Sequence, residues 1–372
     1  MKIIETNRLS KTYRRVRKGE GLKESIRSLV KREYEEKEAV KELDLSVEEG
    51  AFIGLIGPNG AGKTTLTKML TGIIAPTSGE IAVMGYYPND LKNDFKRQYA
   101  IVMGQKSQLF YELTANDTLR LFKEIYGLGE LEFQDTKAYF TELFGVEKLL
   151  DVQVRTLSLG ERMKLELMAA LIHNPRILFL DEPTIGLDAG ASRQIRGFLR
   201  KINKEKGTTI LLTSHYMEDI RALCDRCVVI NHGTKIYDGS TEALFERYQR
   251  DRVISVSFSH PLEALKMRES PESRERLELS GKTESRESLE SSGKPDLREE
   301  LVLPEGAQIL EDEPWKKVIR IPKEKSSVLL QRLMEYHPRD VTVEEDEIGK
   351  VVERIYAQGS NAALQSAFWR QQ

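Results

Sequence analysis

The stretch that decides the fold is Gly57-Pro58-Asn59-Gly60-Ala61-Gly62-Lys63-Thr64, which follows the apolar run Ala51–Ile56 and precedes a helical pattern over Thr64–Leu70. It matches the pattern G-x-x-x-x-G-K-[ST] at every fixed position. Glycines let backbone N–H groups turn inward around phosphate oxygens, and the N-terminus of the following helix adds a favourable dipole. The sequence therefore predicts a strand, a phosphate-binding loop and a helix that together bind a nucleoside triphosphate.

Two parts of the sequence supply polar side chains for catalysis, namely this loop and the end of a second apolar run. Lys63 is expected to reach the terminal phosphates, Thr64 to ligate Mg²⁺ and Thr65 to add a nucleotide contact. The run Ile177–Leu180 delivers Asp181 and Glu182 at its end. Asp181 suits the Mg²⁺ shell, and Glu182 suits a general base that polarises the attacking water.

The bulk composition excludes several classes of protein. The 372 residues carry 57 basic and 59 acidic side chains, a net charge of -2, so no global field favours nucleic acid. No apolar run approaches the roughly 20 residues that cross a bilayer, and the N-terminus lacks the apolar core of a signal peptide. We therefore expect a cytoplasmic protein. The pair Cys224 and Cys227 has no second pair to complete a zinc site, which favours two buried structural thiols over a redox or metal motif.

Residues 1–248 alternate short apolar strands with helices, the pattern of a mainly parallel sheet covered on both faces, and so predict an α/β domain. Within them, residues 14–37 are basic and carry apolar residues at helical spacing. This segment is predicted to be a helical insertion. It either packs on its own domain or faces lipid headgroups or a membrane partner. Residues 105–160 are predicted to form a largely helical subdomain.

Residues 249–358 are predicted to form a small α+β domain, followed by a tail over 359–372. Within it, residues 260–300 lose nearly all aliphatic side chains, and Glu272–Lys282 is nearly repeated by Glu284–Lys294. So polar a stretch cannot bury enough apolar surface to offset its ordering entropy, which predicts a disordered insertion with order resuming at Trp315.

A third element separates this chain from other triphosphatases. Leu157-Ser158-Leu159-Gly160-Glu161 precedes the Asp181 strand and resembles the signature motif of the ATP-binding cassette (ABC) family. Gln105 after the strand Tyr99–Met103, Gly186-Leu187-Asp188 after Glu182, and His215 after Thr213-Ser214 stand in that family's order. The resemblance covers roughly residues 1–240. It implies the fold of an ABC-type phosphate-loop domain with a helical subdomain.

The resemblance also implies roles for single residues. Tyr13 is expected to stack on adenine, Gln105 to sense Mg²⁺ and the attacking water, and His215 to contact the γ-phosphate. Ser158, Gly160 and Glu161 belong to the signature that closes on a second subunit's nucleotide, and Asp188 to the contact between subunits. Gln105 is preferred over Gln108 because it lies nearer the strand end. His173, His232, His260 and His337 have no such context and are predicted to be structural.

The implied function is an ATPase that uses ATP and Mg²⁺, dimerises with itself or a sister chain, and drives a separate integral-membrane permease. Export is favoured over import. The protein would then lie at the inner face of the cell membrane through that permease. A soluble ABC-family ATPase acting on ribosomes or DNA is the alternative. The signature departs from the family in Leu159, where Gly is usual, and in Glu161, where Gln is usual.

Overall fold

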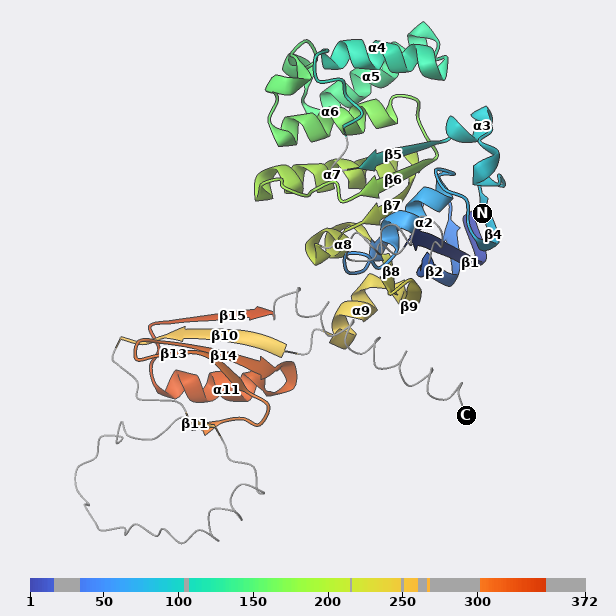
Figure 1. Cartoon of the computed structure of the whole chain (residues 1–372). Helices are drawn as coiled ribbons and strands as arrows, with labels where there is room; N and C mark the ends of the chain where they lie inside the picture. Colours follow the sequence, from blue (N-terminus) through green and yellow to red (C-terminus); the bar gives the residue numbers. More distant parts are fainter. Residues whose placement is uncertain are drawn as a thin grey trace, which may run out of the picture. The chain divides into compact units, whose positions relative to one another are not determined.

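A computed structural model describes residues 1–16, 34–103, 107–214, 216–248, 251–259, 266–267 and 302–345. The chain divides into two compact units, whose described residues run over 1–244 and 245–345 (Figure 1). No helix in this part of the chain is long and apolar enough to span a membrane. The described residues do not include Gln105, His215, most of the 14–37 and 260–300 segments, or residues 346–372, which hold the end of the predicted second domain and the 359–372 tail.

The first unit is built on a six-stranded sheet in the order β5-β6-β7-β3-β8-β9. Its strands are β3 (Phe52–Ile56), β5 (Tyr99–Met103), β6 (Ile177–Asp181), β7 (Thr209–Thr213), β8 (Arg226–Asn231) and β9 (Thr234–Ser240). All neighbours pair in parallel except β8 and β9, which form an antiparallel hairpin. Strands β3 and β7 are buried at every residue. The parallel pairing and the burial of these strands confirm the mainly parallel sheet predicted from the apolar runs.

Helices cover this sheet, and three of them lie beyond one of its edges. They are α2 (Lys63–Leu70), α3 (Asn93–Lys96), α4 (Ala115–Tyr126), α5 (Glu130–Phe144), α6 (Leu159–Leu171), α7 (Ala189–Lys206), α8 (Met217–Leu223) and α9 (Thr241–Tyr248), with 3-10 turns at Pro88–Asp90, Glu147–Leu149 and Val154–Thr156. Helix α6 packs on β5 and on α4 and α5, so these three helices stack beyond the β5 edge (Figure 1). Helices α4 and α5 lie within the residues 105–160 predicted as a helical subdomain, and α6 begins at the end of that range.

A second, antiparallel sheet in the order β2-β1-β4 completes the unit, with β1 (Lys2–Val16), β2 (Tyr34–Glu48) and β4 (Ser78–Val83). The prediction of a helix over 14–37 is wrong at both ends of that segment. Residues 14–16 pair with residues 34–36 as a continuation of the β1–β2 ribbon, and Arg14 Nε lies 2.8 Å from Glu36 Oε1 across the strands. Cross-strand pairing of opposite charges supports the extended form.

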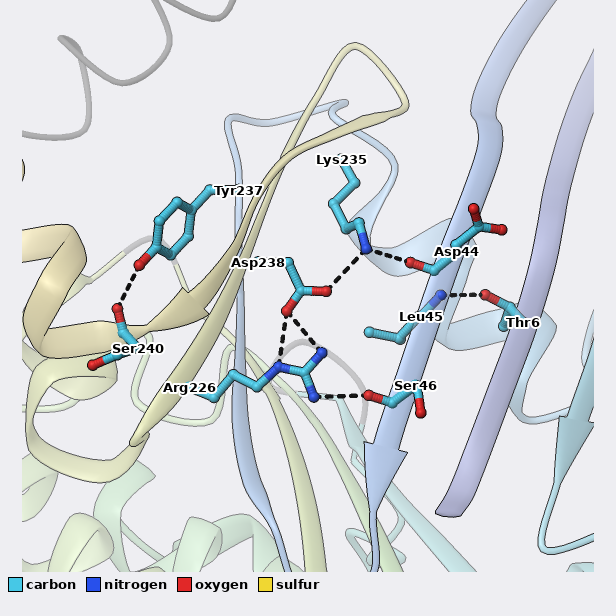
Figure 2. Close-up of polar contacts among 9 residues, drawn as sticks. All are labelled: Thr6, Asp44, Leu45, Ser46, Arg226, Lys235, Tyr237, Asp238 and Ser240. Carbon is cyan, nitrogen blue, oxygen red and sulfur yellow. Dashed lines mark hydrogen bonds and ion pairs between the residues drawn. The ribbon is translucent and has the colours of Figure 1, made fainter.

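A charged cluster joins the two sheets (Figure 2). Asp238 on β9 accepts from Arg226 Nε at 2.8 Å and from Lys235 Nζ at 2.9 Å. The same two cations donate to carbonyls of β2, Arg226 to Ser46 and Lys235 to Asp44, each at 2.7 Å. Every charged group in this cluster therefore has an oppositely charged or carbonyl partner, and the β8–β9 hairpin is fixed along β2.

The second unit is an antiparallel sheet in the order β13-β14-β10-β15 with one helix. Its elements are β10 (Asp251–Ser257), β13 (Gln308–Glu313), β14 (Lys316–Pro322), α11 (Lys323–Glu335) and β15 (Asp340–Glu345), beside a short parallel pair, β11 (Lys266–Met267) and β12 (Val302–Leu303). Ile254, Ile319 and Leu329 lie in its buried core. The boundary predicted at Trp315 is too late, since strands β12 and β13 precede it. Strand β12 has only two residues, and the charged residues of β13 leave no continuous apolar run.

Candidate functional site

The phosphate loop lies between β3 and α2, and two of its glycines are required by close approach of other backbone segments. A Cβ on Gly57 would lie 2.4 Å from the Ile230 carbonyl oxygen, and one on Gly62 would lie 2.3 Å from that of Ala39. Gly62 also has a φ of 111°, which L side chains rarely adopt. The loop is therefore seated between β2 and β8, where only glycine fits.

A hollow of about 720 Å³ opens over this loop. Its lining includes the predicted nucleotide residues Tyr13 and Asn59 to Thr65, together with Asp181 and Glu182. Its volume is in the range of small-molecule sites. Lys37, Lys68, Met103 and Ile185 line it too and were missed. Lys68 stands one helical turn after Thr64, so the spacing could have placed it on the same face.

Lys63 is held inside the loop. Its side chain is 6% exposed, and Nζ donates to the Gly57 carbonyl at 2.6 Å and the Pro58 carbonyl at 3.2 Å. Burial lowers the pKa of Lys63, while the charges of Glu182 and Asp181 act in the opposite direction. The ammonium is thus desolvated beside the position where terminal phosphates would provide a full negative charge.

Oxygen ligands converge at the carboxyl ends of β6 and β7. Thr64 Oγ1 donates to Asp181 Oδ2 at 3.2 Å, and Thr213 Oγ1 donates to Asp181 Oδ1. Asp181 and Thr213 are register partners in the parallel ladder, which explains why the two meet. A carboxylate and a hydroxyl at the helix start are donors of the kind that Mg²⁺ prefers.

Glu182 follows in a strained backbone conformation. Its φ is 55°, in the left-handed region, and its N–H donates to the Thr213 carbonyl at 3.0 Å. A non-glycine residue in this region costs of order 1 kcal/mol and is over-represented at functional sites. Glu182 also lines the hollow over the phosphate loop, as expected for the predicted general base.

Tyr13 and Lys37 line the same hollow from the β1–β2 ribbon. They are cross-strand partners on β1 and β2, and both line the hollow. The Tyr13 ring is 40% exposed, and Lys11 Nζ lies 5.5 Å from its centroid. The ribbon therefore presents an accessible aromatic face beside two cations, despite the intervening segment between Tyr13 and the phosphate loop.

The Ser158 motif starts helix α6 and forms a capping box. Ser158 Oγ donates to Glu161 Oε2 at 2.7 Å, Ser158 N donates to the same oxygen at 2.9 Å, and Glu161 N donates back to Ser158 Oγ at 3.3 Å. The hydrogen bond from the Ser158 hydroxyl lowers the pKa of Glu161. Glu161 thus caps the helix and places a carboxylate beside Ser158.

Ser158, Gly160 and Glu161 line a second hollow of about 380 Å³ with Lys164 and Asp188. Asp188 caps α7 by accepting from Ala191 N at 2.8 Å. Among the described residues, none lines both this hollow and the one over the phosphate loop. The structure therefore places residues predicted around the phosphate loop in one hollow, and Ser158, Gly160, Glu161 and Asp188 in another.

The turn after the undescribed residues 104–106 is held by a buried carboxylate. Glu166 on α6 is 3% exposed and accepts from the Gln108 N–H at 2.9 Å and from the Ser107 hydroxyl. The Gln108 side chain itself donates to the Ile101 carbonyl. Gln108 therefore contacts its own strand. The role given to Gln105 stays a prediction.

A parallel sheet with a glycine loop after β3, and an Asp-Glu pair ending a strand that is two places away in the sheet, define a phosphate-loop nucleoside triphosphatase. Comparison with known proteins narrows this class. The family model described as ABC transporter matches residues 40–185. The chain is 36% identical to the ABC transporter ATP-binding protein NatA of Bacillus subtilis, over 56% of this chain and 84% of that protein.

Two further comparisons agree. The chain is 35% identical to the Nod factor export ATP-binding protein I of Rhizobium sp., over 68% of this chain and 82% of that one. A solved ATP-binding subunit of an ABC transporter is 27% identical with a TM-score of 0.54, over 66% of this chain and 93% of its own. A dimeric ATP-binding cassette in a post-hydrolysis state with ADP and Pi is 25% identical with a TM-score of 0.54, over 64% and 98%.

The chain belongs to the ABC transporter ATP-binding proteins, and it is an ATPase of that family. The predicted fold class and the recognition drawn from the Ser158 motif are both confirmed. The roles of the individual site residues stay predictions.

Proposed function

We propose that this chain is the ATP-hydrolysing subunit of an exporter, that it closes on ATP as a pair of chains, and that it drives a separate permease. The observation that carries the proposal is the separation of the two hollows. The phosphate loop and the Ser158 signature line different hollows of one chain, so a site that contains both needs a second chain. The cassette solved as a dimer with ADP and Pi supports such pairing.

In this proposal the described residues bind and orient ATP. Tyr13 stacks on the adenine, the loop N–H groups and Lys63 hold the β- and γ-phosphates, and Ser158 and Gly160 of the second chain contact the γ-phosphate. Thr64 and Asp181 would hold Mg²⁺, which supplies charge neutralisation at the β- and γ-oxygens.

Glu182 is the proposed general base. Its carboxylate orients a water and takes a proton from it as the water oxygen bonds to the γ-phosphorus, and the bond to the β-γ bridging oxygen breaks to release ADP. Glu182→Gln keeps the shape of the side chain and removes this base. The variant should bind ATP and turn over slowly, whereas normal turnover would exclude Glu182 from the role.

The permease is proposed to contact the helical part. Apolar side chains stay exposed there, among them Phe110 and Tyr111 at 48% each and Ile125 at 59%. Phe110 and Tyr111 directly follow the turn that Glu166 holds, so this surface is connected to α6 and its Ser158 motif. Relatives named for Nod factor export and linearmycin resistance support export as the direction.

Fractionation tests this assignment. The chain, expressed alone, should stay out of the membrane fraction, and co-expression with its permease partner should bring it there. Phe110→Ser with Tyr111→Ser should lose this recruitment while ATP hydrolysis by the purified chain persists. Recovery with ribosomes, with or without the permease, would contradict the proposal. Recruitment by the permease alone would support a location on the inner face of the membrane that depends on this partner.

A further inference from the structure

The turn between β8 and β9 has no role in the nucleotide chemistry described above. Strand β8 ends at Asn231 and β9 begins at Thr234, so the turn consists of His232 and Gly233. His232 and Gly233 have φ values of 47° and 81°. Positive φ at both positions is the requirement of the type I′ turn that suits two-residue hairpins.

This turn is bonded to the phosphate loop and to β2 at once. The Gly233 N–H donates to the Ala61 carbonyl at 2.9 Å, and the Gly233 carbonyl accepts from the Lys41 N–H at 2.8 Å. Ala61 belongs to the phosphate loop, and Lys41 stands two residues after Ala39, which lines the nucleotide hollow. Gly233 thus joins the phosphate loop to strand β2.

The bond to Ala61 has a consequence for phosphate binding. In a trans peptide the carbonyl and the next N–H point to opposite sides, and the chain has no cis peptide among its described residues. Since the Ala61 carbonyl faces Gly233, the N–H of Gly62 points the other way, toward the hollow that Ala61 and Gly62 line. Gly233 therefore sets the direction of a donor that a phosphate would use.

The hairpin that carries the turn is itself fixed (Figure 2). Arg226 and Lys235 share the Asp238 carboxylate and each donate to a carbonyl of β2. On the other side of β2, the Leu45 N–H donates to Thr6 Oγ1 at 2.8 Å. The hairpin, β2 and β1 are thus linked from the turn to the hairpin base, so the turn has little freedom to leave Ala61.

We propose that Gly233 is a positioning residue for nucleotide binding: its peptide groups, held by the Arg226–Lys235–Asp238 cluster, orient the Ala61–Gly62 peptide toward the phosphates. The inference rests on the proposed function, because it assumes that the hollow over the loop binds a nucleotide. Gly233 itself does not touch the nucleotide and acts through Gly62.

The test compares two glycine variants of the full chain by calorimetric titration with ADP, which is not hydrolysed. Gly233→Ala strains a left-handed residue and places a Cβ 3.0 Å from the Ala39 carbonyl oxygen. Gly207→Ala is the matched control: Gly207 has a φ of 67°, it follows α7, and its built Cβ meets no atom within 4 Å. Both should lower the thermal midpoint because both strain a left-handed residue.

The expected result is an ADP dissociation constant about tenfold higher in Gly233→Ala, and unchanged within twofold in Gly207→Ala, since only the first displaces an N–H that bonds to the phosphate loop. Equal constants for the two variants would overturn the proposal. Should Gly233→Ala not fold, Asp238→Asn decides: it loosens the hairpin and should weaken ADP binding about threefold, and an unchanged constant would overturn it.

The wild-type titration distinguishes failure of the proposed function from failure of the role proposed for Gly233. A wild-type chain that binds no ADP would overturn the proposed function and this inference together. A wild-type chain that binds ADP, with variants that bind it equally well, would overturn only the role of Gly233.

Discussion

Replacing Lys63 by Met should change stability and nucleotide binding in opposite directions. Lys63 is 6% exposed, and its ammonium donates to two loop carbonyls, at 2.6 and 3.2 Å. Burial lowers the pKa of Lys63 in the folded state. A lysine whose folded pKa is lowered destabilises the fold below that pKa, and the cost is relieved only as the pH rises through it.

The size of the effect follows from this burial. Replacing a buried, incompletely compensated charge by an apolar side chain of similar length is worth about 1 kcal/mol or more in stability. For a unit of this size that corresponds to a rise in Tm of about 2–4 °C. Ligand at a hundred times its Kd adds about 2.7 kcal/mol to a chain that binds it. The wild type should therefore gain about 5–10 °C with saturating ADP, and Lys63→Met about 1 °C or less.

Calorimetric melts at pH 7 with and without ADP measure both effects on one sample. Lys63→Met should melt above the wild type without nucleotide and below it with saturating nucleotide. Met replaces the long Lys stem, so lost packing is small. A variant less stable than the wild type without ADP would show that the contacts of the Lys63 ammonium with the loop carbonyls outweigh the cost of its desolvation. The buried ammonium would then stabilise the fold, against this prediction.

Two further predictions concern other charged groups. Burial lowers the pKa of His173 to about 4, from its usual value near 6.5. The fold should therefore lose about 2 kcal/mol between pH 7 and pH 5, because only the unfolded state takes up the proton. His173→Gln should show a smaller drop in Tm over that range, and an equal drop would contradict this. Glu161→Gln, in a Glu182→Gln background, should lower the ATP concentration for half-maximal dimerisation about fivefold, since in the proposed dimer one negative charge is removed beside the triphosphate. Glu142→Gln, at an exposed position of α5, is the control with the same charge change, and light scattering at varied ATP is the measurement.

The main sheet and the phosphate loop could be predicted because several signals coincide there. The apolar runs of β3 and β7 are buried on both faces, so their composition alone indicates a parallel sheet. The Gly57–Thr64 pattern has its glycines where backbone contacts demand them, at Gly57 and Gly62. The Asp181-Glu182 pair follows directly from the strand it ends.

Helix starts are hard to predict from apolar periodicity, because the periodicity begins after the capping residues. Helix α6 starts at Leu159 behind Ser158, and α7 at Ala189 behind Asp188. The first periodic apolar side chains, Met163 and Ile195, lie several residues further along the chain. The S-x-x-E capping box at Ser158 and Glu161 is a local signal that marks the first of these starts.

Contacts between distant segments could not be predicted from periodicity. Nothing local in the sequence indicates that Gly233 bonds to Ala61, that Lys37 faces Tyr13 across the ribbon, or that Glu166 holds the turn at Gln108. These pairs depend on strand register and helix packing. The charged strand β13 escaped notice for a related reason, since its intermediate burial leaves no continuous apolar run.

The proposed function requires ATP to assemble one site from two chains. Light scattering of the purified Glu182→Gln chain, with ATP and Mg²⁺ and again without nucleotide, measures this assembly. We expect a particle of twice the chain's mass with ATP, which returns to one chain when the nucleotide is removed. A mass that stays at one chain with ATP saturating the phosphate loop would rule out a shared site.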